Sequence, residues 1–154
     1  MAASIKGTHP PRIVIAVGLP GSGKTSYFSS LGVHAISSDD VRLLLADDPT
    51  DQSIHRQVFA TIRYLVRQRI SIGRDLTYVD ATHLTRKERR PYLEIGRKYG
   101  APVEVLFFDT PLDVCLARNA GRARVVPEDA IRAMARKLQR PLRSEGFAKV
   151  TPVA

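Results

Sequence analysis

The residues best suited to chemistry begin with the run Gly18-Leu19-Pro20-Gly21-Ser22-Gly23-Lys24-Thr25, which matches the pattern G-x-x-x-x-G-K-[ST]. Its glycines let the backbone curl so that successive N–H groups point at phosphate oxygens, and a following helix adds partial positive charge. Lys24 can reach the β- and γ-phosphates of a nucleotide, and the Thr25 hydroxyl can ligate Mg²⁺. The run therefore predicts a P-loop that binds a nucleoside triphosphate through all eight of its residues.

Asp39 and Arg42 form a second candidate pair, spaced three residues apart on one face of a helix start. In phosphoryl transfer a carboxylate accepts the proton of the attacking hydroxyl, and positive charge surrounds the transferring group. The pair could supply both. A helix cap with an i,i+3 ion pair explains the same spacing, so the spacing alone leaves both interpretations open. Asp40 is the weaker candidate base, because the helix dipole favours an acid in the first turn.

Three further residues could complete a phosphoryl-transfer site. Arg118 and Arg122 are four residues apart near Gly121, so they could form a mobile lid that neutralises the charge of a polyphosphate. A solvated basic helix face is the alternative. Asp80 follows an apolar stretch, where it could hold Mg²⁺ through a water or simply cap the next turn. The sequence shows no spacing typical of a zinc site or a Ser-His-Asp triad.

The elements that must position these residues alternate along the chain. Apolar stretches predict strands over residues 13–17, 33–37, 76–80, 103–108 and 147–150. Apolar periodicity and capping residues predict helices over 25–31, from Ser38 or Asp39 as the cap, from the cap Asp51 to near Gly73, over 86–99 after Thr85, from the cap Thr110, and from Pro127.

Alternating strands and helices predict a mostly parallel sheet with helices on both of its faces. Ligands of such sheets bind beyond the carboxyl ends of the strands. The P-loop and the segments over residues 37–42 and 80–85 each follow a predicted strand. We therefore expect the three segments to share one rim of the sheet.

The composition sets limits on the class of protein. The sequence has 154 residues, enough for one domain, and we expect a loose tail over residues 1–12 before a domain over 13–154. Its formal net charge of +9 comes from 18 Arg and 6 Lys against 15 acids, which favours phosphate-rich partners or reflects a compositional bias. The single cysteine, Cys115, excludes an internal disulfide and suits a reducing cytoplasm. No apolar run approaches the ~20 residues of a membrane span.

Five segments in order, GLPGSGKT, ISSDDVR, VDATHLTRKERR, LARNAGRARVVPEDAI and QRPLRSEGF, resemble the kinase domain of polynucleotide 5′-kinases. That family includes phage and bacterial end-healing enzymes and the short AAA-type ATP-binding proteins similar to them. The resemblance runs from about Ile13 to Val150. It implies a three-layer α/β/α P-loop NTPase fold, nucleotide-kinase-like, with about five mostly parallel strands in the order 2-3-1-4-5.

The resemblance also implies roles for the candidate residues. Lys24 and Thr25 would hold the donor phosphates and Mg²⁺, and Asp39 would be the general base on a 5′-hydroxyl. Arg42 would grip a phosphate of the acceptor strand, and the lid arginines, Arg118 and Arg122, would contact the donor. The implied reaction transfers the γ-phosphoryl of ATP, or of another NTP, to the 5′-OH end of DNA or RNA.

Two other classes of function stay open at this point. A small-molecule or nucleotide-sugar kinase, of the zeta-toxin or antibiotic phosphotransferase type, would use Lys24, Thr25 and Asp39 on a different hydroxyl. A non-catalytic nucleotide switch is the third, although the sequence contains no N-K-x-D motif of the kind that reads a guanine base. His83 stands where the phage-type DTNL segment has Asn, and the sequence alone gives it no physical role.

Overall fold

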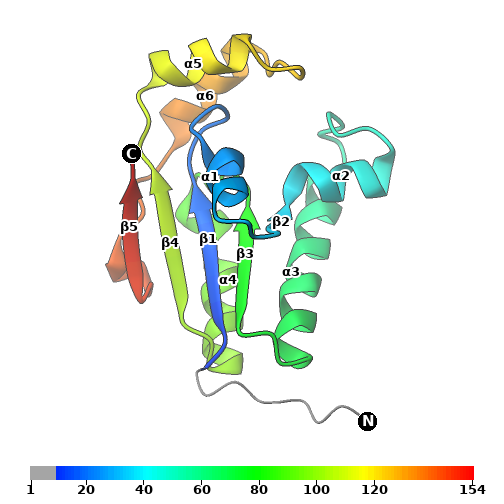
Figure 1. The fold of residues 1–154 in the computed structure, drawn as a ribbon, viewed down its shortest axis with the longest axis vertical. Coiled ribbons are helices and arrows are strands. Elements are labelled where there is room, and N and C mark those ends of the chain that lie inside the picture. Colours follow the sequence, from blue (N-terminus) through cyan, green and yellow to red (C-terminus); the bar gives the residue numbers. More distant parts are fainter. Residues whose placement is uncertain (1–9) are drawn as a thin grey trace.

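The computed structural model describes residues 10–154 and is built on a five-stranded sheet. The strand order is β2-β3-β1-β4-β5, and neighbouring strands run parallel, which confirms the predicted fold class and order (Figure 1). The strands are β1 Arg12–Val17, β2 Ile36–Ser37, β3 Leu76–Asp80, β4 Val103–Phe108 and β5 Lys149–Val153.

Helices cover the sheet and its carboxyl end. They are α1 Lys24–Ser30, α2 Ser38–Ala46, α3 His55–Ser71, α4 Arg86–Tyr99, α5 Leu112–Ala120 and α6 Glu128–Lys137, followed by the 3₁₀ turn η1 Arg143–Glu145. Figure 1 shows α1 on one face of the sheet and α4 on the other, with α3 beside α4. The helices α5 and α6 lie above the strand ends, opposite α2. Within residues 10–154 no helix is long and apolar enough to cross a membrane.

The central strand β1 is buried on both faces because its run of aliphatic residues is continuous. Ile13, Ile15 and Val17 belong to the main core, which α3 and α4 cover. Ala16 faces the other way and packs with Phe28 of α1 and with Phe108. Burying each large aliphatic side chain contributes roughly 1.5–3 kcal/mol. The buried strand β1 therefore fixes the position at which the following loop begins.

The ends of two predicted strands are wrong. β2 is limited to Ile36–Ser37, because Val33 and Ala35 pack against the cluster of Ala16, Phe28 and Phe108 before the chain reaches the sheet. β5 lies at Lys149–Val153 rather than 147–150, because Phe147, 3% exposed, enters the core from the preceding loop.

Other boundaries also differ from the prediction. β1 begins at Arg12, so the last residue of the predicted tail is strand, and residues 1–9 lie outside the described part of the chain. Asp51 does not cap α3, which begins at His55. Its carboxylate instead accepts hydrogen bonds from the backbone and hydroxyl of Ser53 in the preceding turn. Thr110 does not cap α5, because its hydroxyl donates to the Ser22 carbonyl at 2.9 Å.

The loop between β3 and α4 is held by a buried ion pair. The fully buried Arg89 guanidinium contacts both carboxylate oxygens of Glu145, at 3.0 and 3.1 Å. Its Nη1 also donates to the carbonyls of His83 and Leu84. At the start of α4 the Thr85 hydroxyl accepts the Glu88 N–H, as the sequence predicts for this cap. The loop that carries Leu84 is therefore fixed on both sides.

Candidate active site

The P-loop forms a cradle that has room only for glycine at two positions. Gly21 has a φ of +81°, and a Cβ there would lie 2.6 Å from the Cys115 carbonyl oxygen of α5. A Cβ on Gly18 would lie 2.6 Å from Ser22 Oγ and 2.9 Å from Phe108 Cβ. Ser22 Oγ is buried and has no hydrogen-bond partner among the described residues. The curled backbone and this unsatisfied hydroxyl fit an anion seated in the loop.

Lys24 is a buried cation beneath this cradle. Its Nζ donates to the carbonyls of Gly18 at 3.0 Å and Leu19 at 2.8 Å. An ammonium has three donors, so one is left for a phosphate oxygen. Burial lowers the Lys24 pKa to about 8, and the nearby Asp80 opposes that shift, so the ammonium is still mostly charged at pH 7. Gly18 and Leu19 thus hold Lys24, while residues 20–25 line the cleft.

Thr25 and Asp80 meet at the position expected for a metal ion. Thr25 Oγ1 donates to Asp80 Oδ2 at 2.8 Å, although the residues are 55 positions apart. Burial raises the Asp80 pKa, while the Thr25 hydrogen bond and the Lys24 charge oppose the rise. Residues 10–154 contain no group of three or more His, Cys, Asp or Glu side chains that could hold a metal ion by themselves. A hydroxyl and a carboxylate oxygen are ligands that Mg²⁺ takes in proteins, so Thr25 and Asp80 would suit this ion.

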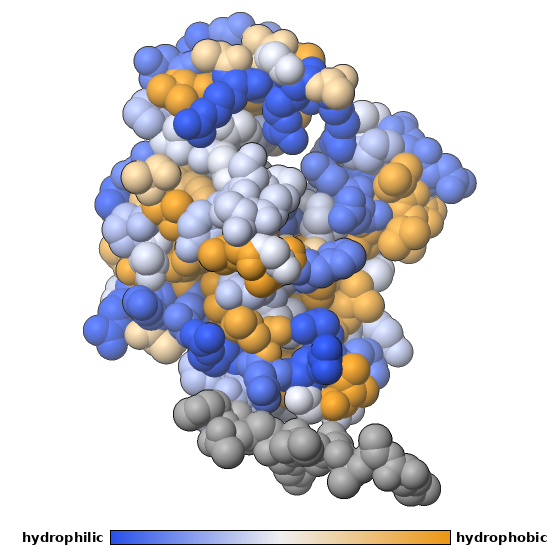
Figure 2. All heavy atoms as spheres, viewed as in Figure 1, coloured by the Kyte–Doolittle hydropathy of each residue, from blue (hydrophilic) through white to orange (hydrophobic). Residues whose placement is uncertain are grey.

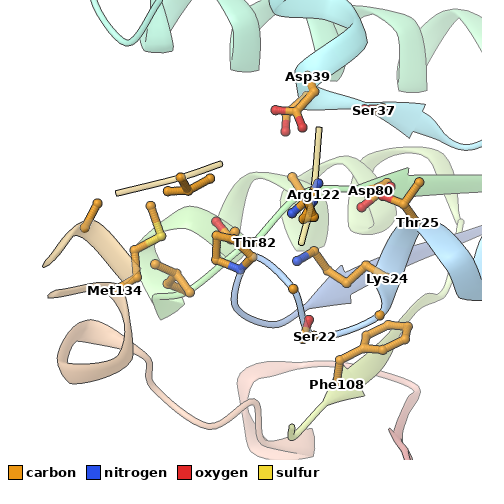
Figure 3. Close-up of a pocket in the computed structure, with 18 of the residues that line it drawn as sticks. Ser22, Lys24, Thr25, Ser37, Asp39, Asp80, Thr82, Phe108, Arg122 and Met134 are labelled. Atoms are coloured by element: carbon orange, nitrogen blue, oxygen red, sulfur yellow. Dashed lines mark hydrogen bonds between the residues drawn. The ribbon is translucent and has the colours of Figure 1, made fainter. Parts of the chain in front are cut away.

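Asp39 and Arg42 lie together on α2, across the cleft from the P-loop. Ser37 is the N-cap, and its Oγ accepts the Asp40 N–H at 3.3 Å. The predicted caps, Ser38 and Asp39, are therefore wrong. Because Ser37 caps the helix, the Asp39 carboxylate is free to face the cleft (Figure 3). Arg42 Nη1 lies 3.7 Å from Asp39 Oδ1.

In the described part of the chain, the buried guanidinium of Arg42 does not have a hydrogen-bond partner for every one of its donors. Its side chain is only 6% exposed, against 51% for its partner Asp39. Its Nε has no hydrogen-bond partner among the described residues. A buried unpaired donor of a charged group costs at least ~1–3 kcal/mol, so this position favours an anionic ligand.

Three arginines approach the same cleft from α5 and from the lid loop, which we define as residues 121–126. Arg118 Nη1 lies 3.5 Å from the Gly21 carbonyl oxygen of the P-loop. Arg122 is close enough to Lys24 for its charge to lower the Lys24 pKa. Arg124 Nη2 lies 3.6 Å from Asp39 Oδ1, so it joins the lid loop to α2. Sequence reasoning missed Arg124, whose one signal was its spacing of two from Arg122.

The lid loop is closed at its base by Asn119, which sequence reasoning also missed. Its amide is 3% exposed, accepts the Val126 N–H at 2.9 Å and donates to the Val126 carbonyl at 2.7 Å. One side chain thus satisfies both backbone groups at the far end of the loop. The buried amide fixes where the loop starts and ends, while Arg122 remains exposed between them.

These parts enclose one cleft of about 1180 Å³. Figure 2 shows the surface hollowed between the part formed by α5 and α6 and the part formed by α2. In Figure 3 Lys24, Arg122 and the Asp39 carboxylate face this space, and Met134 lies on the far side. Besides the P-loop, α2 and the lid loop, the cleft is lined by a further set of residues that we call the acceptor end: Gln52, His55, Phe59, Leu84, Glu88, Met134 and Lys137.

His83 has a structural role that the sequence did not reveal. The ring is fully buried, with Nδ1 2.6 Å from the Ala16 carbonyl oxygen and Nε2 2.9 Å from the Tyr92 hydroxyl. Because a carbonyl only accepts, Nδ1 carries the proton and Nε2 accepts from Tyr92. Burial lowers the His83 pKa to about 4, so the ring is neutral near pH 7. It ties the loop after β3 to β1 and does not reach the cleft.

Comparison with known proteins agrees with this architecture. The profile of a family described as an AAA domain matches residues 13–141. The chain belongs to this family. A 48-residue segment is 40% identical to L-seryl-tRNA(Sec) kinase of Mus musculus, covering 31% of this chain and 13% of that protein. The L-seryl-tRNA(Sec) kinase of Methanococcus maripaludis is 21% identical over 136 residues, 84% of this chain and 53% of that one. The chain thus spans about half, or less, of these relatives.

Solved structures share the fold of this AAA domain. The structure of the Pnkp1/Rnl/Hen1 RNA repair complex matches with a TM-score of 0.69 and 19% identity, covering 90% of this chain and 47% of that one. A gluconokinase from Sinorhizobium meliloti matches with a TM-score of 0.61 and 18% identity, covering 93% and 82%. These likenesses show a shared fold, and what the cleft of this chain binds has to be argued from its own residues.

Proposed function

We propose that this AAA domain is a polynucleotide kinase that transfers the γ-phosphoryl of ATP, or another NTP, to the 5′-OH end of DNA or RNA. The observation that carries the proposal is the pair formed by Asp39 and the buried Arg42 guanidinium, facing a P-loop across one cleft. A base and an unsatisfied cation side by side suit an acceptor that offers a hydroxyl next to a phosphate.

The donor half of the site would work mainly by positioning. The P-loop N–H groups and Lys24 would bind the β- and γ-phosphates, with the buried ammonium acting in a medium of low dielectric. Thr25 and Asp80 would hold Mg²⁺, whose charge offsets that of the phosphate oxygens. Arg118 and Arg122 would approach the same phosphates from the lid side.

The acceptor half would orient the hydroxyl and remove its proton. Asp39 is half exposed and faces the cleft, so its carboxylate can accept a proton from the incoming 5′-OH. As the oxygen attacks the γ-phosphorus, the bond to the β-bridging oxygen breaks and ADP leaves. Arg42 would hold the neighbouring phosphate of the acceptor and so fix the direction of attack.

A small-molecule kinase is the second candidate, and one contact favours it. Lys137 Nζ of α6 lies 3.9 Å from Glu88 Oε1 of α4, and both line the acceptor end of the cleft. This pair narrows the exit that a polymer would need. The Lys137 side chain is 65% exposed, against 30% for Glu88, and pairs at the surface are worth only ~0–1 kcal/mol, so a charged acceptor strand can displace Lys137.

One incubation separates these candidates. The chain is mixed with γ-labelled ATP, Mg²⁺ and a 5′-OH oligonucleotide, in parallel lanes with DNA, with RNA and with no acceptor. We expect label on the oligonucleotide, lost with Lys24→Ala and reduced on the order of 10²–10⁴-fold with Asp39→Asn. Activity of Asp39→Asn close to that of the parent would remove Asp39 as the base.

Outcomes without label on an oligonucleotide are equally informative, and further lanes with small hydroxyl-bearing metabolites as acceptors complete the test. Label on a metabolite but never on an oligonucleotide would select the small-molecule kinase. Tight nucleotide binding with no transfer in any lane, unchanged by Asp39→Asn, would select a binding module. Binding of ATP by Asp39→Asn is the folding control, because Asp39 does not contact the P-loop in the ion pairs that it forms.

A further inference from the structure

A second groove lies on the outer side of α4, apart from the cleft. Its volume is about 320 Å³, and it is lined by Arg86, Arg90, Leu93 and Arg97 of α4 together with Ser144 and Glu145 of η1. The three arginines recur at i, i+4 and i+11, so they share one side of the helix. All three are exposed. This side of α4 therefore presents a row of guanidinium groups around a depression.

The positive charge of this groove is not balanced by the protein. Glu145 is the one carboxylate among the lining residues, and both its oxygens contact Arg89. Its Oε2 also accepts the Leu142 N–H at 2.8 Å. Within residues 10–154, the side chains of the three lining arginines form no ion pair or hydrogen bond. Guanidinium groups grouped in this way attract a polyanion.

The groove and the cleft both border the start of α4, on different sides of the helix. Leu84 and Glu88, two residues before and after Arg86, both line the cleft. The Arg86 N–H donates to Gln139 Oε1 at 2.8 Å, so the segment after α6 borders the start of the groove. Lys137 adds a further cation at the same edge. Glu88 and Arg86 lie about 200° apart around α4, at ~100° per residue, so a strand leaving the cleft would cross the first turn of α4 to reach this row of arginines.

We propose that this groove binds the sugar-phosphate backbone of the acceptor strand, beyond the end that is phosphorylated. The inference rests on the proposed polynucleotide kinase function and adds a second site for the same substrate. Arg86 and Arg97 are eleven residues apart, which is about 16 Å at ~1.5 Å per residue. Phosphates follow one another every ~3.4 Å along a strand in a duplex, so several phosphates fit this length. Leu93 provides an apolar floor between the guanidinium groups.

The test uses a triple variant and a matched control. Arg86→Gln/Arg90→Gln/Arg97→Gln removes three charges from the groove and keeps side chains of similar length. Arg12→Gln/Arg74→Gln/Lys149→Gln removes three exposed charges at the amino ends of β1, β3 and β5, the edge opposite the P-loop. The probe is a fluorescent, 5′-phosphorylated oligonucleotide of about 16 nucleotides, titrated by anisotropy at rising salt. It cannot accept a phosphoryl group, so it reports binding alone.

We expect the groove variant to bind this probe at least about 10-fold more weakly than the parent at low salt. Its salt dependence should be shallower by about 2 in the log–log slope, since each lost phosphate contact removes ~0.7 for a single strand. KM for the 5′-OH form of the oligonucleotide should rise about 10-fold, and KM for a dinucleotide acceptor and for ATP should stay within about 2-fold. The control variant should match the parent chain throughout.

The two proposals fail in different ways. If the parent transfers no label to any oligonucleotide but binds the probe, and the groove variant does not, the kinase assignment fails and the groove remains a nucleic-acid site. If the parent phosphorylates the oligonucleotide and the groove variant equals it in probe affinity, salt slope and KM, the groove proposal is overturned. The arginines would then face another partner, such as an acidic protein surface. No binding of the probe by the parent also overturns the groove proposal.

Discussion

The two halves of the cleft differ in how firmly the protein holds them. On the donor side, Lys24 and Thr25 make hydrogen bonds of 2.8–3.0 Å to fixed groups. On the acceptor side, Asp39 is half exposed and its two arginine contacts are 3.6 and 3.7 Å long. The donor half is thus preorganised, while the acceptor half is held by loose contacts between α2 and the lid loop.

This difference follows from what each half must do in the proposed reaction. A triphosphate tail is the same in every donor, so a rigid cradle can fit it, and rigidity avoids reorganisation during transfer. An acceptor has to enter, be oriented and leave, so its side needs parts that move. The exposed pair between Arg124 and Asp39 is worth ~1 kcal/mol or less, so opening it is easy.

The largest expected effect comes from a substitution in the P-loop, which belongs to the rigid donor half of the cleft. Gly21→Ala puts a Cβ 2.6 Å from the Cys115 carbonyl oxygen, at a φ of +81° that only glycine adopts freely. Because α5 backbone cannot yield as a side chain would, the P-loop must move. We expect ATP affinity, measured by calorimetric titration, to fall about 1000-fold, or ~4 kcal/mol.

Gly32→Ala is the matched control for this change. Gly32 also has a positive φ, +67°, but a Cβ there would have no heavy atom within 4 Å. The variant should lose about 1 kcal/mol of unfolding free energy and keep its ATP affinity. Equal ATP affinities for the two variants would show that the P-loop accommodates a Cβ at Gly21 without losing its shape.

The second effect tests whether the rigidity extends to the loop after β3. Arg89→Met leaves Glu145 buried without its cation and two loop carbonyls without a donor. Breaking a buried pair from one side typically costs ~3–5 kcal/mol, which should appear as a lower midpoint in chemical denaturation. Arg132→Met, which removes an exposed pair to Glu128, should cost less than about 1 kcal/mol. Similar midpoints for both variants would contradict a rigid loop.

Most of the rigid half could be predicted from the sequence, and in the other half the sequence indicated Asp39 and Arg42 but not Arg124. The P-loop and the helix over 86–99 were predicted from local patterns, namely a glycine motif after a β-branched run and the cap Thr85. The strand order was implied by the resemblance to polynucleotide 5′-kinases. The contact between Thr25 and Asp80 follows from parallel topology, which brings both strand ends to one rim.

What the sequence did not reveal depends on contacts between distant segments. Arg124 contacts Asp39 across 85 positions, and Arg89 pairs with Glu145 across 56 positions. No local sequence pattern indicates either contact. Asn119 and His83 act through single backbone groups that only the fold brings near. The caps of α2 and α3 were wrong for a related reason, since Ser37, Ser38 and Asp39 are all good caps and packing chooses among them.

The third effect is a pH dependence of stability that comes from His83, which joins the loop after β3 to β1. The His83 pKa is about 4 in the folded chain against 6.5 for a free histidine, so between these values the unfolded state binds more protons. Stability therefore falls as pH drops from 6.5 towards 4, by about 3 kcal/mol at ~1.4 kcal/mol per unit. Denaturation midpoints at several pH values measure it.

His83→Asn isolates this contribution. Asn tolerates the φ of +45° at this position, can donate to the Ala16 carbonyl and does not titrate. The variant should lose much of the acid sensitivity between pH 6.5 and 4, while the parent chain keeps it. An unchanged pH profile would place the acid sensitivity in other groups, such as His55, whose pKa is also lowered by desolvation.

The smallest effect comes from single substitutions in the lid loop, because its two arginines lie in different halves of the cleft. Arg122 lies near Lys24, and Arg124 contacts Asp39, although only two positions separate them. Arg122→Gln should raise KM for ATP roughly 5-fold, and Arg124→Gln should raise KM for the acceptor by a similar factor, about 1 kcal/mol each. Steady-state kinetics with each substrate varied in turn measures both. If each variant shifted the two KM values equally, the lid loop would act as a single unit, and the boundary between a rigid donor half and a mobile acceptor half would have to be drawn elsewhere.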